Sequence, residues 1–179
     1  AGVPRLWLLG SSMYSAQLAA EKGLPYVFAH HFSGHGTREA LAFYRENFQA
    51  SDLLDRPTTF LTANVAVAPT AEEARDLARP NAVNMARLRG GLPMHPLALV
   101  EDPVDDLPPQ LEAIVASSLR QGGVGDPGSV AAHLTELAAE LDVDEVMLHP
   151  IASEHVGVGA GEAPARVRSL ELLAEALAS

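Results

Sequence analysis

Apolar residues along this chain fall into two kinds of run, short unbroken runs and longer runs with helical spacing. Leu6 to Leu9 are four apolar residues in succession, which is typical of a parallel strand covered on both faces. Gly10-Ser11-Ser12 ends that run. A helix-forming stretch around Ala16 to Ala20 then stops at Gly23 and leads into a second apolar run over Tyr26 to Ala29. The pattern predicts a strand, a serine-bearing turn, a helix and a second strand.

The rest of the chain continues this alternation. Strands are predicted over 58–68 and 144–149, where β-branched and apolar residues gather. Helices are predicted over 38–48 with Thr37 as N-cap, from Thr70 through Leu77 with a break at Pro80 and a resumption over 81–88, over 111–119, from Pro127 to Leu141 behind Asp126, and over 164–177. Helical spacing places two apolar stripes inward: Val130, Leu134, Leu137 and Leu141, and Val167, Leu170, Leu173 and Leu177.

Strands that alternate with helices indicate an α/β fold with a parallel sheet. The handedness of the crossovers leaves two arrangements open, a doubly wound open sheet and part of a (β/α) barrel. We expect one domain over 1–179 with an irregular insertion at about 90–109, which holds five of the prolines. The insertion is expected to be a surface excursion or lid, and its acidic cluster a solvated surface: Glu101, Asp102, Asp105 and Asp106.

Composition narrows the classes of function that this chain can have. The 179 residues suffice for a hydrophobic core without cysteine, of which the chain has none, and a cytoplasmic location is expected. The formal net charge of −11, with scattered basic residues, argues against nucleic-acid binding, and no apolar run is long enough for a membrane helix. Because the chain lacks an initiator methionine and enters a strand within five residues, we expect an upstream part.

The serine turn after the first strand is the strongest chemical candidate. Ser11, Ser12 and Ser15 lie where the N–H groups of a starting helix lack intrahelical partners and the helix dipole is positive, so hydroxyls there can complete an anion site. The alternative is that one serine caps the helix and the others fill space. Parallel sheets collect ligands at the carboxyl ends of their strands, which also draws attention to His30 and His31 after the second strand.

Other polar motifs point to structure. Adjacent strand residues face opposite sides, so His30 and His31 are not expected to share a metal ion, and one of the two should face the mouth of the barrel or sheet. His149 is expected at the edge of the core. Gly122 to Gly125 lacks the flanking residues of a phosphate loop and is interpreted as a turn. No Ser-His-Asp set can be assembled from the spacing, and we name no catalytic residue.

Several motifs resemble the bacterial luciferase-like, flavin-dependent monooxygenases, and the resemblance covers nearly the whole chain. The most specific is PRLWLLGSS at 4–12, followed by YSA at 14–16, AAE at 19–21, GLP at 23–25 and FAHHF at 28–32. Further matches lie at Ala42, Tyr44, Arg45 and Phe48, and at 65–74, 124–127, 144–146 and 166–174.

The resemblance implies a fold of the TIM (β/α)8-barrel type, of which this chain covers about the last four β/α units. It also implies that the turn after the first strand holds the phosphate of FMN through backbone N–H and hydroxyl groups. The cofactor-binding residues implied are Gly10, Ser11, Ser12, Met13, Tyr14, Ser15 and His30. The chain departs from some members at Ser11, where they have an acidic residue.

A complete enzyme of this kind would use reduced FMN from a flavin reductase, together with O2, to oxygenate a small organic substrate. The partners expected are flavin, substrate, and either the missing first half of the barrel or a second copy in a dimer. Two alternatives stay open: a non-catalytic half-barrel that binds flavin or phosphate, and an oxidoreductase that uses deazaflavin.

Overall fold

The computed structural model describes residues 4, 6–102 and 107–178. Its elements follow the order β1 (Leu8–Gly10), α1 (Met13–Lys22), β2 (Tyr26–Phe28), α2 (His30–Ser33), α3 (Thr37–Asn47), β3 (Thr59–Val67), α4 (Ala71–Arg89), α5 (Pro109–Ser118), β4 (Val124–Gly125), α6 (Pro127–Leu141), β5 (Val146–Pro150) and α7 (Pro164–Leu177). The chain divides into two compact units, one up to Ala63 with Glu136–His149, the other Asn64–Thr135 with the chain from Pro150. That the whole chain forms one domain stays a prediction.

The first unit is built on three parallel strands. Leu8, Leu9 and Gly10 of β1 are in register with Tyr26, Val27 and Phe28 of β2, which are in register with residues 59–61 of β3. Beyond β3 comes β5, where the Leu61 amide donates to the Glu145 carbonyl over 3.1 Å. The described residues therefore form an α/β fold with an open parallel sheet, and closure into a barrel remains to be tested.

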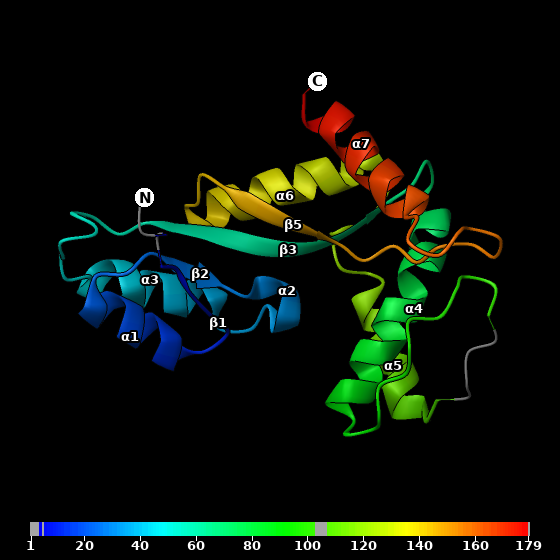
Figure 1. The fold of residues 1–179 in the computed structure, drawn as a ribbon, viewed down its shortest axis with the longest axis horizontal. Helices are drawn as coiled ribbons and strands as arrows, with labels where there is room; N and C mark the ends of the chain where they lie inside the picture. The colour runs from blue at the N-terminus through cyan, green and yellow to red at the C-terminus, as the bar shows by residue number, and fades with distance from the viewer. Residues whose placement is uncertain (1–3, 5, 103–106, 179) are drawn as a thin grey trace. The chain divides into compact units, whose positions relative to one another are not determined.

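One face of this sheet is covered by helices. The core cluster contains the strand residues Tyr26, Phe28 and Leu61, with Leu8 and Val146 packed against it. Helix α1 contributes three alanines, α3 contributes Leu41 and Tyr44, and the end of α6 contributes Leu141. Helices α1 and α3 lie side by side along β2 (Figure 1). These buried residues agree with the predicted helical and strand patterns.

Glycines set the helix boundaries in the first unit. Helix α1 ends at Gly23, whose φ of 58° is left-handed, as the sequence predicts. The N-cap of α3 is Gly36, with φ of 75°, so the prediction of Thr37 as N-cap is wrong. Thr37 is instead the first helical residue, buried, and its hydroxyl donates to the Gly34 carbonyl over 3.0 Å.

The second unit contains a helix that continues through a proline. Helix α4 packs on α5 through Ala82, Val83, Leu111 and Val115, as the neighbouring ribbons show (Figure 1). Pro80 lies inside α4 and is buried, so the predicted break is wrong. Packing of the residues that follow Pro80 against α5 holds this part of the chain in the helix, since tertiary contacts override a local preference.

Two further features of the second unit depart from the sequence prediction. Val124–Gly125, expected to be a turn, forms the short strand β4, parallel to Ala66–Val67 of β3. Helix α7 has the predicted bounds but buries Ser169 and Leu173, whereas Val167, Leu170 and Leu177 are exposed. The Ser169 hydroxyl accepts a hydrogen bond from the Val67 amide over 2.5 Å, and this contact fixes which side of α7 meets the sheet.

The predicted insertion has little regular structure. Apart from Pro109, which begins α5, its described residues form neither helix nor strand, and residues 91–97 are exposed. Asp105 and Asp106 of the acidic cluster lie outside the described residues. Within the described part of the chain, no helix has both the length and the apolar character that a membrane crossing requires.

Candidate functional site

The turn between β1 and α1 is shaped by a close approach of Gly10 to Ser15. A Cβ atom built on Gly10 would lie 2.4 Å from both Cβ and Oγ of Ser15, so no larger residue fits without rearrangement. Ser11 and Ser12 follow and are exposed. Ser12 is the N-cap of α1, with extended φ and ψ of −142° and 161°, yet its side chain makes no capping hydrogen bond. The hydroxyls of Ser11 and Ser12 therefore lie at an open helix start.

Ser15 has a different role from its neighbours, because it is buried and internally bonded. Its hydroxyl donates to the Ser12 carbonyl over 2.6 Å. The Tyr26 hydroxyl lies 3.1 Å from Ser15 Oγ and must be the donor in that contact, since the proton of Ser15 is already used. Burial raises the pKa of Tyr26, and the hydrogen bond with Ser15 opposes this. Ser15 thus joins the serine turn to β2.

The first turn of α1 suits an anion. It contains no acidic residue, and Met13 and Tyr14 project from it with exposed side chains, Tyr14 at 72%. The N–H groups of a first helical turn have no intrahelical acceptors, and the dipole there is positive. The residues present therefore fit a phosphate, with backbone N–H groups and two serine hydroxyls as donors.

The two neighbouring histidines turn in different directions. They lie in the short helix α2, where His30 Nδ1 is 2.9 Å from Thr37 Oγ1 and His31 Nδ1 is 2.5 Å from Thr62 Oγ1. The described residues contain no group of three side chains suited to a metal ion. His35 is exposed in the following loop.

His31 also contacts a third histidine that the sequence placed at the core edge. Its ring and that of His149 pack edge to face, with centroids 5.7 Å apart. Burial of His31, and then the charge of His149, lower the pKa of His31 below its ordinary value of 6.5. His31 therefore stays neutral at neutral pH.

The sheet face opposite the helices carries Thr62 and His149, the two residues that His31 contacts. Leu9, Val27 and Phe60 are in register, one residue out of step with the core-facing side chains, so they share the opposite face. Thr62 lies two residues after Phe60 on that face. Val146 of β5 packs against the core. Because successive strand residues point to opposite faces, Met147 and His149 lie on the face opposite the core. We call this surface the uncovered face; its residues are Leu9, Val27, Phe60, Thr62, Met147 and His149.

The uncovered face is mainly apolar. Leu9 is 56% exposed and Met147 45% exposed, and the Trp7 ring packs on Phe60 with a centroid distance of 5.0 Å. Val27 of β2 and Thr62 of β3 are buried, so the exposed apolar side chains of this face lie on β1 and β5. His31 and His149 are the titratable groups that we place at this face.

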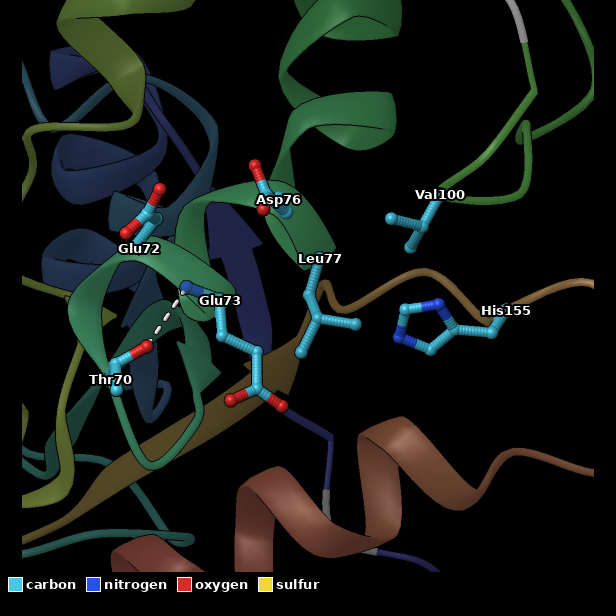
Figure 2. A pocket seen from close by; sticks show the side chains of 7 residues that line it. All are labelled: Thr70, Glu72, Glu73, Asp76, Leu77, Val100 and His155. Carbon is cyan, nitrogen blue, oxygen red and sulfur yellow. Dashed lines mark hydrogen bonds between the residues drawn. The ribbon is translucent and has the colours of Figure 1, made fainter.

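A pocket in the second unit offers a contrasting environment. Its volume is about 270 Å³, and Figure 2 shows the side chains that line it, from the start of α4 and from two loops: Thr70, Glu72, Glu73, Asp76, Leu77, Val100 and His155. Three carboxylates line it, which is unfavourable for a phosphate. Carboxylates in a first helical turn stabilise the helix dipole, and the Thr70 hydroxyl caps α4 by accepting from the Glu73 amide over 3.2 Å. We interpret this pocket as structural.

Comparison with known proteins decides the family. Residues 1–145 match the family model described as luciferase-like monooxygenase. The chain belongs to the luciferase-like monooxygenase family. This confirms the resemblance drawn from the sequence motifs, and the serine turn and the histidine-bearing segment both lie within the match.

Relatives of this luciferase-like chain are about twice its length. The uncharacterised protein YvbT of Bacillus subtilis (strain 168) is 36% identical over 170 residues, which are 95% of this chain and 48% of YvbT. A luciferase-like monooxygenase of Escherichia coli (strain K12) is 33% identical over 171 residues, 93% of this chain and 48% of that protein. The crystal structure of apo-MsnO8 superposes with a TM-score of 0.74 at 27% identity, covering 99% of this chain and 52% of the other.

Sequence reasoning found the turn of this luciferase-like chain but did not resolve the histidines. It named His30, whose Nδ1 is directed to Thr37, whereas His31 contacts the uncovered face through Thr62. The sequence feature that could have identified His31 was the position of the two histidines after the second strand, from which one of them was expected to face the mouth of the sheet. Choosing between them requires knowing that the chain enters a short helix after Phe28 and does not continue as a strand.

Proposed function

We propose that this chain is the flavin-phosphate-binding half of an FMN-dependent monooxygenase of the luciferase-like family. The observation that carries the proposal is the open start of α1, where Ser12 occupies the N-cap without a capping hydrogen bond and no acidic residue lies in the first turn. Family membership supports an oxygenase role for the whole protein. When bound, reduced FMN supplies the electrons and the reactive centre toward O2.

The residues of the turn have separate roles in this proposal. The hydroxyls of Ser11 and Ser12 and the N–H groups of Met13 and Tyr14 would donate to the phosphate. Ser15 and Gly10 would shape the turn, because Ser15 already donates to Ser12 and approaches Gly10 closely. The uncovered face would then line the ligand space, closed from water by the other half of the barrel that the family resemblance implies.

Flavin titration tests the phosphate site. We expect Ser11→Ala with Ser12→Ala to weaken FMN binding roughly tenfold or more, because two hydrogen bonds to a charged group are lost. Riboflavin, which lacks the phosphate, should bind the wild type and the double variant equally. Ser117→Ala, a change of an exposed helical serine in the second unit, is the matched control.

Two results would contradict the proposal. One is equal FMN affinity of the folded double variant and the wild type, and the other is an equal loss for riboflavin. Ser15→Ala is unsuitable for this test because it removes hydrogen bonds within the fold. Tighter binding of a deazaflavin than of FMN would assign the site to that cofactor class.

A further inference from the structure

A chain of hydrogen bonds runs from the core of the first unit to the start of α1. Tyr26 of β2 is fully buried, and its hydroxyl donates to Ser15 Oγ over 3.1 Å. Ser15 Oγ in turn donates to the Ser12 carbonyl over 2.6 Å. The direction of the chain is fixed, because a carbonyl oxygen only accepts and the single proton of the Ser15 hydroxyl is used there.

The chain ends on the carbonyl of the N-cap residue of α1. An N-cap carbonyl ordinarily accepts the first intrahelical hydrogen bond. Here the Ala16 amide lies 3.5 Å from the Ser12 carbonyl, which is longer than a usual amide hydrogen bond. The Ser15 hydroxyl, at 2.6 Å, is the closer donor. The orientation of the Ser12 carbonyl is therefore set by a side chain that is bonded to the core.

The Ser12 carbonyl and the Met13 amide belong to one peptide group, so the chain also orients the amide. A trans peptide group is planar, and its C=O and N–H point in opposite directions. With the carbonyl turned toward the buried Ser15 hydroxyl, the Met13 N–H points away from it. Met13 is the first residue of α1, where an N–H has no intrahelical acceptor. Hydrogen bonds in series polarise one another, so the chain also makes this N–H a stronger donor.

The ring of Tyr26 is itself held in place by a second buried tyrosine. It packs on the Tyr44 ring with a centroid distance of 5.3 Å. The Tyr44 hydroxyl donates to the Leu24 carbonyl over 2.9 Å and accepts from the Thr58 amide over 3.1 Å. The two tyrosines thus share one core, but their hydroxyls have different partners, and that of Tyr26 is bonded to the serine turn.

We propose that Tyr26 is a positioning residue of the flavin-phosphate site. Through Ser15, its hydroxyl aims and polarises the N–H of the peptide group between Ser12 and Met13, and this N–H donates to the phosphate. Because Tyr26 is fully buried, it acts through the chain and not by contact with the ligand. The inference rests on the proposed function, since it assigns a share of the phosphate affinity to a residue of the core.

Removal of single hydroxyl groups tests the chain of hydrogen bonds in the 179-residue protein. We expect Tyr26→Phe to weaken FMN binding roughly threefold or more and to leave riboflavin binding unchanged, since riboflavin lacks the phosphate. Tyr44→Phe is the matched control, because it removes a hydroxyl from the same core without breaking the chain. It should lower the free energy of unfolding but leave the ratio of FMN affinity to riboflavin affinity at the wild-type value. In the Ser15→Ala background, Tyr26→Phe should not change that ratio further, because the chain is already broken.

NMR of the unmodified protein covers the case in which a variant does not fold. FMN should shift the signals of the Met13 amide proton and of the Tyr26 ring carbon that bears the hydroxyl, and riboflavin should shift them less. Equal shifts with the two ligands, a wild-type affinity ratio in folded Tyr26→Phe, or a ratio lowered as much by Tyr44→Phe would overturn the inference. Unchanged FMN affinity in the variant with Ser11→Ala and Ser12→Ala would instead reject the proposed function, and this inference with it.

Discussion

Ser12 and Thr70 are the N-caps of α1 and α4, but their side chains differ in hydrogen bonding. Thr70 Oγ1 accepts a hydrogen bond from the Glu73 amide, whereas the Ser12 side chain makes no such bond. We expect Thr70→Ala to lower the free energy of unfolding by about 1 kcal/mol, the usual loss of a capping bond, and Ser12→Ala by less than about 0.5 kcal/mol. Urea denaturation of the two variants measures the difference.

This comparison separates capping from ligand binding. A loss of about 1 kcal/mol or more in Ser12→Ala would show that its hydroxyl caps α1 in solution, which was the alternative for the serine turn. A small loss together with weakened FMN binding would assign the hydroxyl to the ligand. The stability measurement and the flavin titration thus answer different questions about one residue.

Individual residues show how far sequence reasoning reaches. The exposed serine turn after β1 was predictable because a strand, a glycine and a helix start follow one another in sequence. The internal role of Ser15 was not, since it depends on contacts with Gly10 and Tyr26 that form when α1 packs beside β2. His31 required the contact with Thr62, 31 residues away.

At the scale of elements, the bounds of α7 were predictable and its buried side was not. Pro164 marks the start of the helix, and the apolar stripe 167/170/173/177 was expected to face inward. In the structure, Ser169 and Leu173 are buried and Ala165 is partly buried against the core. These three residues are four positions apart and form the side of α7 that faces inward. The deciding contact is polar, so a hydrophobic pattern could not reveal it.

This contact leads to a stability prediction for α7. Ser169→Ala leaves the buried Val67 amide without its acceptor, and we expect the free energy of unfolding to fall by about 1–3 kcal/mol. Ser117→Ala, at an exposed helical position, should change it by less than about 0.5 kcal/mol. Equal urea midpoints for Ser169→Ala and the wild type would show that the Val67 amide finds another acceptor.

At the scale of the whole molecule, the parallel α/β class follows from the alternation of elements, while finer topology does not. Strand β4 is two residues long, and the glycines at positions 122, 123 and 125 predict a turn. It pairs with β3 because Gly123 lies against the Asn64 carbonyl, where a Cβ atom would be only 2.1 Å from the oxygen. The division into two compact units depends on long-range packing that local patterns do not record.

Titratable groups in the fold set an upper and a lower limit to the pH range in which it is most stable. Burial raises the pKa of Tyr26 and of Tyr44 above the ordinary value of 10.0, against weaker opposing hydrogen bonds. The unfolded chain then ionises first, so stability is lost as pH rises above about 10. The pKa of His31 is lowered, so the unfolded chain takes up the proton first and stability falls as pH drops below 6.5.

Two exposed carboxyl groups add to the loss at lower pH. Hydrogen bonds from His155 and then Val156 lower the pKa of Glu101, and hydrogen bonds from Ser129 lower that of Asp126. For each, stability is present above the unfolded pKa, ordinarily 4.5 and 3.8, and is lost as pH falls through the lower folded pKa. The His31 contribution is therefore the first to be lost on acidification.

Substitution of His31 isolates that first step. We expect the urea midpoint of the wild type to be highest between about pH 6.5 and 10 and to decline on both sides. In His31→Gln, which keeps a donor for Thr62 but does not titrate, the decline just below pH 6.5 should become shallower while the alkaline limb is unchanged. His35→Gln, at an exposed position, is the control and should keep the wild-type profile. An unchanged acid limb in His31→Gln would mean that the imidazole is not held neutral by burial and His149.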